Sequence, residues 1–489
     1  MHKKVAVIGS GFSGLSAASV LASKGAAVTV FEKNDSLGGR ARTFSVDGFT
    51  FDMGPSWYWM PDVFEHFFSL FGKSSKDYYE LKLLDPAFTI FYGKNDSLTI
   101  PASLEAIYQL FEKEEKNGAD KLRRFLKEAE LKYNLSMSDL VYLPSNSLFE
   151  YAKPQVLRNI TRLQLFSSFH SHVRKFFSSP RLLQLMEFPL LFLGATSREI
   201  PALYSLMNYA AFNLSTWYPM GGFGKITEAM ASIAKDLGVQ FKTGEAISSI
   251  KPMSENSFSI SSTTGQHTSD AVIGAADYQH VDGLLESRYR NYTETYWQRK
   301  TFAPSCLIFY LGINRRLNSL HHHNLFFDEA LDQHAHEIYK DPQWPSKPLF
   351  YICCPSKTDA SVAPTGHENL FILMPLAPGI SDGEQLRAKY FDIIIERIKN
   401  ITGEDLAPSI VFKRSYCLDN FVSDYNAYKG NAYGLASTLK QTAVLRPAIR
   451  NKKLKNFFYC GQLTLPGPGV PPAIISGQIA AKQLMKSIF

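Results

Sequence analysis

Three glycines near the N-terminus have the spacing of a phosphate-binding loop. Gly9, Gly11 and Gly14 stand between an apolar run, Val5–Ile8, and a stretch of small residues that predicts a helix. The first glycine permits a tight turn, the second lets the backbone approach a pyrophosphate, and the third allows a helix to pack closely on a strand. Unpaired N–H groups and the positive end of the helix dipole would then face the phosphates. The spacing therefore predicts a dinucleotide site.

An acidic residue completes this pattern. A second apolar run, Ala27–Phe31, predicts another buried strand, and Glu32 follows it directly. A carboxylate at this distance from the glycines, about 20 residues, accepts hydrogen bonds from ribose hydroxyls. Strand, glycines, helix, strand and acid occur in the order that a nucleotide-binding βαβ unit requires. This order favours a nucleotide site over a purely structural use of the glycines.

A second glycine pair distinguishes between dinucleotides. The stretch NDSLGGRAR, residues 34–42, runs from just after the acid into Gly38 and Gly39 and then two arginines. Such a pair brings another backbone segment close to the ligand, with Arg40 or Arg42 near a phosphate. The stretch resembles the extended fingerprint of the amine-oxidase-like flavoprotein superfamily, in which the dinucleotide is FAD. No second GxGxxG follows a predicted strand, so a separate NADPH domain is not expected.

The C-terminal stretch GQLTLPGPGVPPAIISG, residues 461–477, is a rigid and glycine-rich approach to a final helix. We expect this helix to begin at or beside Ser476 and Gly477. In related flavoproteins such a segment brings a helix N-terminus to the flavin pyrimidine ring, where its dipole stabilises negative charge on reduced flavin. The prolines restrict the unbound conformations of the approach and lower its entropic cost.

Composition limits the remaining possibilities. The 489 residues are 45% hydrophobic and 20% charged, as in an ordinary globular chain. The net charge of +7 is scattered along the sequence, and nucleic acid is not an expected partner. Aromatic residues are concentrated, because residues 49–92 hold 14 Phe, Tyr or Trp in 44 positions. This concentration fits either a dense core with a hairpin or an apolar ligand tunnel.

The predicted elements indicate an α/β fold with interleaved domains. A Rossmann-like FAD-binding domain would be assembled from residues 1–92, 222–290 and 440–489. Residues 93–221 form a helical substrate- or membrane-facing region, and residues 291–439 supply a mixed sheet to an α+β substrate domain. This arrangement is the amine-oxidase-like flavoprotein architecture.

Three motifs together resemble one branch of that superfamily. The N-terminal fingerprint, the stretch FDMGPSWYWMPDVFE at 51–65 and the C-terminal stretch are similar to the bacterial-type FAD-dependent carotenoid desaturases, most of all to phytoene desaturases. The resemblance covers the whole chain. It implies noncovalent FAD, stepwise desaturation of a C40 carotenoid from phytoene to lycopene, and quinone or oxygen as the electron acceptor. A long polyene offers no polar handle, so its binding would depend on buried apolar area.

Other activities stay open on the sequence. One alternative is a 1-hydroxycarotenoid 3,4-desaturase, and another is an amine- or porphyrinogen-type FAD oxidase of the same fold. A third is a flavoprotein that binds lipids without catalysis. Many FAD proteins carry an acid where this chain has Gln462, and no side chain is identified as a catalytic base.

The motifs and the resemblance together give a set of expected cofactor contacts. They are Gly9, Gly11, Phe12, Ser13, Gly14, Glu32, Lys33, Gly39, Arg40, Gly54, Pro55, Ala246, Ile247, Gly461, Gln462, Gly469 and Val470. Cys460 adjoins this set, and we interpret it as a small buried strand residue rather than a covalent flavin attachment point.

Two further expectations concern location and metals. No apolar run is long enough to span a membrane, while residues 154–220 mix isolated cations with Leu and Phe. Such a region fits either a helix in the membrane interface or packing within the core or against a sister subunit. We expect a cytoplasmic protein held peripherally on the inner membrane. The three consecutive histidines at 321–323 are expected in a surface loop, without a metal.

Overall fold

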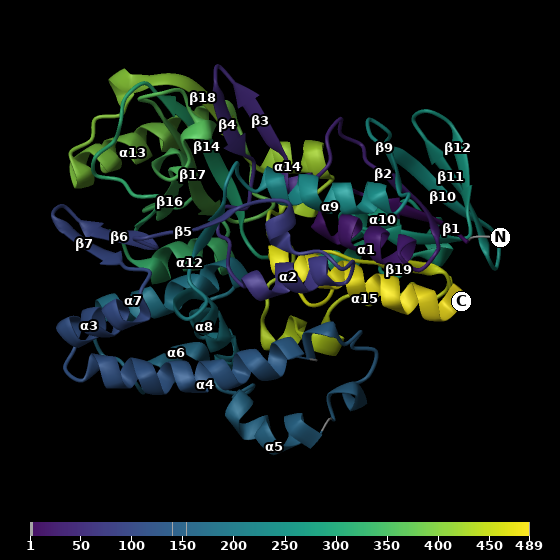
Figure 1. Cartoon of the computed structure of the whole chain (residues 1–489), viewed down its shortest axis with the longest axis horizontal. Helices are drawn as coiled ribbons and strands as arrows, with labels where there is room; N and C mark the ends of the chain where they lie inside the picture. Colours follow the sequence, from purple (N-terminus) through teal and green to yellow (C-terminus); the bar gives the residue numbers. More distant parts are fainter. Residues whose placement is uncertain (1–2, 139, 153, 489) are drawn as a thin grey trace.

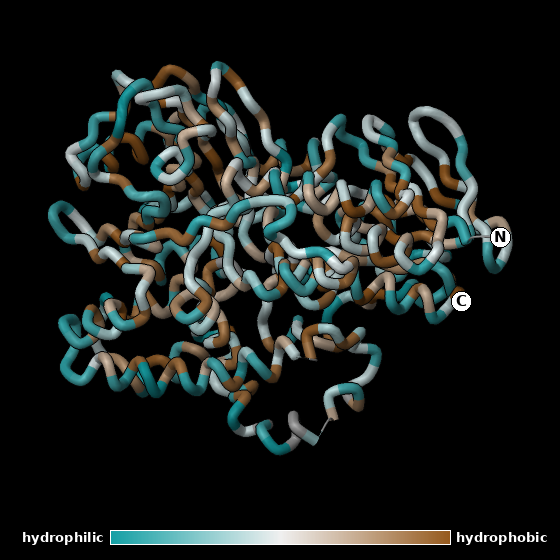
Figure 2. The backbone as a smooth tube through the Cα atoms, viewed as in Figure 1, coloured by the Kyte–Doolittle hydropathy of each residue, from teal (hydrophilic) through white to brown (hydrophobic). Residues whose placement is uncertain are grey.

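The computed structural model describes residues 3–138, 140–152 and 154–488. Figure 1 shows a lobe that holds both chain ends, a second lobe built on a larger sheet, and a layer of helices below the two. Figure 2 shows that hydrophobic segments gather within the lobes and hydrophilic segments in the outer loops.

The first lobe is built on a parallel sheet of buried, apolar strands. Its order is β19 (Phe457–Tyr459), β13 (Ala271–Gly274), β1 (Lys4–Ile8), β2 (Ala27–Phe31) and β9 (Gln240–Lys242). Strands with apolar side chains on both faces require helices on both sides. Helix α1 (Phe12–Ala22) follows β1 and packs between α9 (Gly224–Asp236) and α15 (Val470–Ile488). A small antiparallel sheet, β10 (Ile247–Ser254), β11 (Ser257–Ser262) and β12 (Gln266–Ser269), and helix α10 (Tyr278–Gly283) complete the lobe.

The second lobe is built on a seven-stranded mixed sheet. Its order is β18 (Ile410–Tyr416), β14 (Ser305–Ile313), β17 (Glu368–Leu376), β16 (Phe350–Cys353), β15 (His323–Phe326), β6 (Phe88–Gly93) and β7 (Asp96–Ile100). Side chains alternate along β14, so Leu307 and Phe309 pack with the helix α13 (Glu384–Thr402), while Cys306 and Ile308 face the first lobe. This alternation gives the sheet one face for its own core and one face for a ligand.

Strand pairing corrects one domain boundary. The boundary expected at residue 92 cuts through β6, which pairs with β15 and β7 in the second lobe. Residues 88–92 therefore belong with the mixed sheet rather than the FAD-binding domain. The apolar run at 88–92 predicts a strand, but its partner, β15, lies more than 200 residues away along the chain, and this pairing is invisible to local pattern.

The helical layer comes mostly from one continuous region. Its helices are α3 (Leu104–Glu114), α4 (Gly118–Ser138), α5 (Pro154–Leu163), α6 (Phe169–Val173), α7 (Pro180–Glu187) and α8 (Leu206–Phe212). Among the residues described, no helix is both long and apolar enough to cross a bilayer. The remaining elements are β3 (Thr43–Val46), β4 (Phe49–Asp52), α2 (Pro61–Ser69), β5 (Leu81–Leu83), β8 (Trp217–Pro219), α11 (Glu294–Gln298), α12 (Leu331–Tyr339) and α14 (Leu418–Tyr425), with short 3-10 turns between them.

Two local expectations are wrong. The final helix begins at Val470, six residues before Ser476, because Pro471 and Pro472 occupy its first turn, where a missing N–H costs nothing. The histidines do not form a surface loop: His322 is 3% exposed and His323 is fully buried at the start of β15. Three consecutive polar residues favour a surface loop by composition. Pairing of β15 within the mixed sheet instead places His322 and His323 in the interior.

Candidate active site

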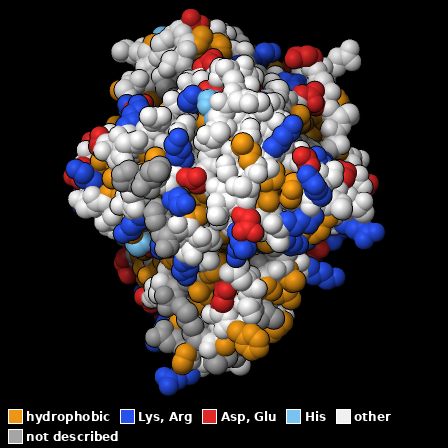
Figure 3. Space-filling model, turned by 90° about the vertical axis from the view of Figure 1, so that its right-hand side faces the viewer, with side chains coloured by type: hydrophobic (Ala, Val, Ile, Leu, Met, Phe, Trp, Pro, Cys, Tyr) orange, Lys and Arg blue, Asp and Glu red, His pale blue; other side chains and the backbone are white. Residues whose placement is uncertain are grey.

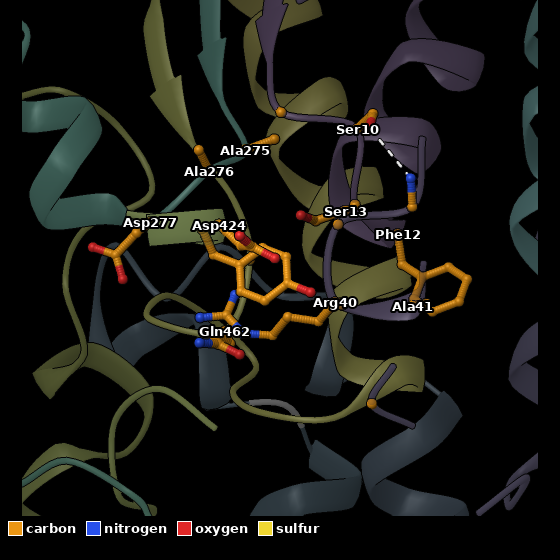
Figure 4. Close-up of a pocket in the computed structure, with 18 of the residues that line it drawn as sticks. Ser10, Phe12, Ser13, Arg40, Ala41, Ala275, Ala276, Asp277, Asp424 and Gln462 are labelled. Atoms are coloured by element: carbon orange, nitrogen blue, oxygen red, sulfur yellow. Dashed lines mark hydrogen bonds between the residues drawn. The ribbon is translucent and has the colours of Figure 1, made fainter. Parts of the chain in front are cut away.

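A cavity of about 360 Å³ lies where the carboxyl ends of β1, β2 and β13 meet the second lobe. Carboxyl ends of neighbouring parallel strands are the usual ligand position in open α/β sheets. The glycine loop after β1 forms one wall, and Cys306 and Ile308 of β14 form part of the opposite wall. Figure 4 shows Arg40 reaching across this cavity toward Gln462.

The glycine loop has the shape that a pyrophosphate needs. A Cβ atom on Gly11 would meet nothing within 4 Å, so this position opens on empty space, and its backbone is extended. A Cβ on Gly9 would lie 2.9 Å from the backbone nitrogen of Ala276, and Gly9 has φ +103. A Cβ on Gly14 would lie 2.0 Å from the carbonyl oxygen of Gly9. Gly14 therefore serves the close packing of α1, and only Gly9 and Gly11 line the cavity.

Helix α1 presents an open N-terminus to this space. No side chain caps its first turn, and the first helical hydrogen bond runs from the Leu15 N–H to the Gly11 carbonyl. The N–H groups of Phe12 and Ser13, both lining the cavity, are thus available to an anion. A helix end without a side-chain cap suits a ligand that supplies the missing acceptors.

Glu32 is positioned by the same loop. One carboxylate oxygen accepts hydrogen bonds from the Ser10 N–H at 3.0 Å and the Ser10 hydroxyl at 2.6 Å. The other accepts from the Asn34 N–H and side-chain amide, both at 2.9 Å. Four donors hold this buried carboxylate at the edge of the cavity and occupy its about four lone-pair sites. A ribose hydroxyl bound here would share an oxygen with these donors or replace the mobile Ser10 hydroxyl.

The two arginines of the second glycine pair have different environments. Arg42 forms a salt bridge of 2.6 Å with Asp424 of α14 and does not line the cavity. Arg40 lines the cavity, donates to the Asn431 carbonyl at 3.1 Å, and has an Nε with no hydrogen-bond partner among the described residues. Burial lowers the pKa of Arg40, and Asp277 opposes this shift. The unused Nε and the buried charge mark Arg40 as the cation for an anionic ligand.

The C-terminal approach meets the cavity at its other end. Gly461, Gln462, Gly469 and Val470 all line it, and Ser476 instead accepts a hydrogen bond of 2.9 Å from the Gly461 N–H. Gly477 has a packing role, because a Cβ there would lie 2.2 Å from the Ser13 carbonyl oxygen of α1.

Gln462 stands where many FAD proteins have an acid. With its amide oriented to satisfy its neighbours, its carbonyl accepts from Arg40 at 3.0 Å and its nitrogen donates to the Ala432 carbonyl at 3.1 Å. A carboxylate in this position would pair with Arg40 and neutralise it. The amide leaves the arginine charge for the ligand.

Nearly all of the cofactor contacts expected from the sequence lie around this first cavity. All of them line the cavity except Gly14. The sequence reasoning missed a group contributed by the second lobe and its connections: Cys306, Ile308, Leu373, Phe421, Asp424, Tyr425, Asn426, Ala432 and Tyr433. It also missed His280, whose pKa burial lowers to about 4. No local motif identifies these residues, because only the docking of the two lobes brings them to the site.

A second and larger cavity, of about 740 Å³, opens from the same region. Both cavities share Gly54, Pro55, Leu373, Tyr433, Gly469 and Val470 as lining residues. The walls of the second cavity are mostly aliphatic and aromatic side chains from the helical layer and the mixed sheet, including Trp57, Trp59, Phe188, Leu191, Ile338 and Leu349. We call this cavity the tunnel. Its volume lies within the range of about 300–1,000 Å³ that is usual for small-molecule sites.

The thiols nearest the site are unreactive. Cys460 is buried and does not line the first cavity, and burial raises its pKa to about 12. Cys306 does line it, and burial likewise raises the pKa of its thiol. A thiol kept protonated is a poor nucleophile.

Together the open glycine loop, the ribose-facing carboxylate and the adjoining apolar tunnel define a dinucleotide-dependent oxidoreductase. Comparison with known proteins specifies the dinucleotide, because the pattern of the flavin containing amine oxidoreductase family matches residues 12–485. A carotenoid 3,4-desaturase of Haloarcula japonica is 41% identical over 99% of this chain and 98% of its own. A zeta-carotene-forming phytoene desaturase of Myxococcus xanthus is 30% identical over 99% and 94%.

Solved structures agree on the fold. A putrescine oxidase bound to putrescine superposes with a TM-score of 0.63 at 14% identity, over 99% of both chains. A cyclohexylamine oxidase of Brevibacterium oxydans gives 0.60 at 14% identity, over 100% of both. The chain belongs to the flavin containing amine oxidoreductase family and, within it, to the carotenoid desaturases of the phytoene desaturase type. It is an FAD-dependent oxidoreductase.

The geometry assigns the parts of the ligand to parts of this chain. Glu32 would hold the ribose, the N-terminus of α1 and Arg40 the pyrophosphate, and the segment from Gly469 to Val470 the flavin ring. When bound, the flavin accepts a hydride equivalent from carbon. The protein's part would be to hold the substrate carbon beside it and to exclude water.

Proposed function

We propose that this enzyme introduces a double bond at the 3,4 position near the end of a long carotenoid, a 1-hydroxycarotenoid being the expected substrate, with noncovalently held FAD. The observation that carries the proposal is the junction of the two cavities at Gly54, Pro55, Gly469 and Val470. A linear hydrocarbon lying in the tunnel would present one bond at this junction. The 41% identity to a carotenoid 3,4-desaturase over nearly the full length supports the choice of bond.

The tunnel suits a substrate with almost no polar groups. At roughly 25 cal/mol per Å² of buried apolar surface, an extended polyene gains its affinity from contact area alone. An amine substrate would need carboxylates in this cavity, and no Asp or Glu is among the described residues that line it. This composition argues against the amine-oxidase alternative, in spite of the shared fold.

A second candidate is stepwise desaturation of phytoene toward lycopene. The 30% identity to a zeta-carotene-forming phytoene desaturase, again over nearly the full length, favours it. Both candidates use the same cavities and the same flavin chemistry, and they differ only in which bond of the polyene reaches the junction.

Membrane contact would supply such a substrate. Phe166, Leu439 and Leu445 line the tunnel and are also 86%, 44% and 52% exposed, so they mark its mouth. Phe149 lies in the same helical layer and is 88% exposed. Figure 3 shows hydrophobic side chains gathered at the lower end of the molecule. Exposed aromatic and aliphatic side chains around an apolar opening fit peripheral docking on a lipid surface. Quinone dissolved in that membrane, or oxygen, would reoxidise the flavin.

Substrate conversion tests the proposal directly. The chain is expressed in cells that accumulate phytoene, and separately in cells that accumulate a 1-hydroxycarotenoid, and the pigments are resolved by chromatography. We expect a product with one added double bond at C3,4 in the second strain only. Conversion of phytoene, with the hydroxylated carotenoid untouched, would establish the second candidate instead. Gly11→Val, which should prevent FAD binding, serves as the inactive control in both strains.

Cofactor attachment is tested on the same protein. Acid precipitation should release all of the flavin as FAD, since the thiol of Cys460 lies outside the cavity and burial raises the pKa of the Cys306 thiol that lines it. Flavin that stays with the denatured chain would contradict noncovalent binding.

A further inference from the structure

A chain of hydrogen-bonded polar groups leads from the edge of the tunnel into the mixed sheet. The Tyr351 hydroxyl, on β16, donates to the Ser56 hydroxyl at 3.0 Å. The same Tyr351 hydroxyl lies 2.6 Å from Nδ1 of His323, on the neighbouring strand β15. Tyr351 is 7% exposed and His323 is fully buried. Ser56 is half-buried in the segment between β4 and α2. Burial of Tyr351 and His323 in an apolar sheet core is costly unless their polar atoms find partners, as Nδ1 and the hydroxyl do here.

The first member of this chain lies next to the junction of the two cavities. Ser56 lines the tunnel directly after Gly54 and Pro55, which border both cavities. Tyr351 also lines the tunnel. The side chains beside them, such as Trp57 and Trp59, are aromatic. Ser56 and Tyr351 are therefore polar positions on a mostly apolar wall beside the flavin cavity.

The last member is held as a neutral imidazole. The Trp57 ring stacks on His323 with centroids 4.0 Å apart and 12° between planes, and His322 contacts it edge-on at 4.5 Å. Burial, with His322 adding to it, keeps the pKa of His323 well below its ordinary value. Its Nε2 has no hydrogen-bond partner among the described residues. Nδ1 of His323 is an acceptor in the tautomer that carries its hydrogen on Nε2, with the Tyr351 hydroxyl turned from Ser56 toward the ring.

We propose that Ser56, Tyr351 and His323 form a relay that removes the proton released when the carotenoid is desaturated, a role that rests on the proposed function. Two C–H bonds break and one C=C bond forms. One hydrogen leaves with both electrons to the flavin, which is reduced, and the other leaves as a proton to the Ser56 hydroxyl. The Tyr351 hydroxyl, which donates to Ser56 at rest, turns toward His323, gives its proton to Nδ1 and takes the Ser56 proton in return.

A weak base suffices for this step. Loss of hydride leaves a delocalised carbocation, and the C–H bond next to such a cation is strongly acidic. An imidazole with a lowered pKa can take that proton and also gives it up readily before the next turnover. The adjacent His322 contacts the His323 ring edge-on, and its Nδ1 lies 2.7 Å from the hydroxyl of the half-buried Thr358. Water, the competing acceptor, is excluded by the apolar wall.

Two variants distinguish a role of these side chains in proton transfer from a purely structural role. Tyr351→Phe breaks the relay in the middle, and His323→Asn keeps an oxygen acceptor for Tyr351 near the position of Nδ1 without a basic site. We expect both to bind carotenoid as the wild type does, measured by quenching of tryptophan fluorescence, and to retain full FAD content. General-base removal typically costs about 10²–10⁴-fold, so single-turnover flavin reduction should slow at least about 100-fold. Tyr92→Phe is the matched control, because it removes a similar hydroxyl bond, to the Arg181 carbonyl, on β6 of the same sheet and outside both cavities.

A solvent isotope effect gives a readout that a structural role would not move. In D₂O the wild type should show a normal effect on flavin reduction, which the relay variants should lose. Variants that reduce flavin within threefold of the wild-type rate, with an unchanged isotope effect, would overturn the relay. A stoichiometric metal in the purified protein would also overturn it, since one nitrogen of each of His322 and His323 and the Cys353 sulfur lie within 4.8 Å of one another. A wild type that converts no carotenoid would refute the proposed function instead.

Discussion

Substitution of Gly477 by alanine should separate two helices that lie in backbone contact. Gly477 is in the middle of α15, where it crosses α1 just after the phosphate-binding loop. An added Cβ would lie 2.2 Å from the carbonyl oxygen of Ser13, 2.8 Å from the Cβ of Ser16 and 2.9 Å from the nitrogen of Ala17. These neighbours are backbone or Cβ atoms, so no side-chain rotation can relieve the overlap.

The magnitude follows from the overlap. Ordinary contacts of a Cβ begin at 3.4 Å, so the helices must move apart by about an ångström. Overpacking of this kind typically costs about 1–3 kcal/mol, and the upper end applies because the backbone must shift. The N–H groups at the start of α1 would move with it. We therefore expect FAD binding to weaken at least tenfold, which corresponds to about 1.4 kcal/mol.

The assay needs both quantities from the same protein. Urea unfolding of the apoprotein gives the free energy of unfolding, and flavin fluorescence gives the dissociation constant for FAD. Gly283→Ala is the matched control, because Gly283 ends α10 and a Cβ there would meet nothing within 4 Å. Alanine should leave that variant unchanged or more stable, by up to about 1 kcal/mol. Equal stability and equal FAD affinity in the two variants would refute the packing argument.

Three further predictions use other parts of the molecule. Gly11→Val should leave the free energy of unfolding of the apoprotein within about 0.5 kcal/mol of the wild type while abolishing FAD retention, because the new side chain fills only ligand space; a FAD-loaded variant would contradict the site. Burial lowers the pKa of Lys132 to about 8, so the native state binds fewer protons than the unfolded state between pH 8 and the ordinary value of 10.5. Stability should therefore rise with pH across this window relative to Lys132→Met, by up to about 1.4 kcal/mol per unit, and parallel pH curves would show that the lysine is not desolvated. Replacing Phe149 and Phe166 together by serine should reduce flotation with anionic liposomes while leaving FAD content unchanged, and undiminished flotation would place the docking surface elsewhere.

Local pattern was sufficient for the phosphate-binding half of the site. The turn at Gly9, the open position at Gly11 and the carboxylate of Glu32 all belong to one βαβ unit of about 30 residues. Their geometry is fixed by backbone constraints that act within that unit. The same holds for the approach to α15, although proline tolerance in the first turn moved the start of the helix from Ser476 to Val470.

Local pattern failed where function depends on docking. Asp424 and Tyr425 border the flavin cavity because α14 packs across it, and nothing in their flanking sequence marks a ligand site. The buried histidines have the same explanation. His323 becomes a possible proton acceptor only when β15 pairs with β16 and brings it to Tyr351.

The sequence by itself determined the nucleotide-binding unit, which depends on residue type and short spacing, through glycine sterics and helix dipoles. The choice of FAD and of an apolar substrate followed from the resemblance of its motifs to those of carotenoid desaturases. Only the tertiary structure decided that a tunnel meets the flavin cavity at Gly54 and Pro55, that Arg40 rather than Arg42 faces the ligand, and that a polar chain ends at His323. These features arise between segments hundreds of residues apart, and their contacts form because each lobe must bury its apolar face against the other.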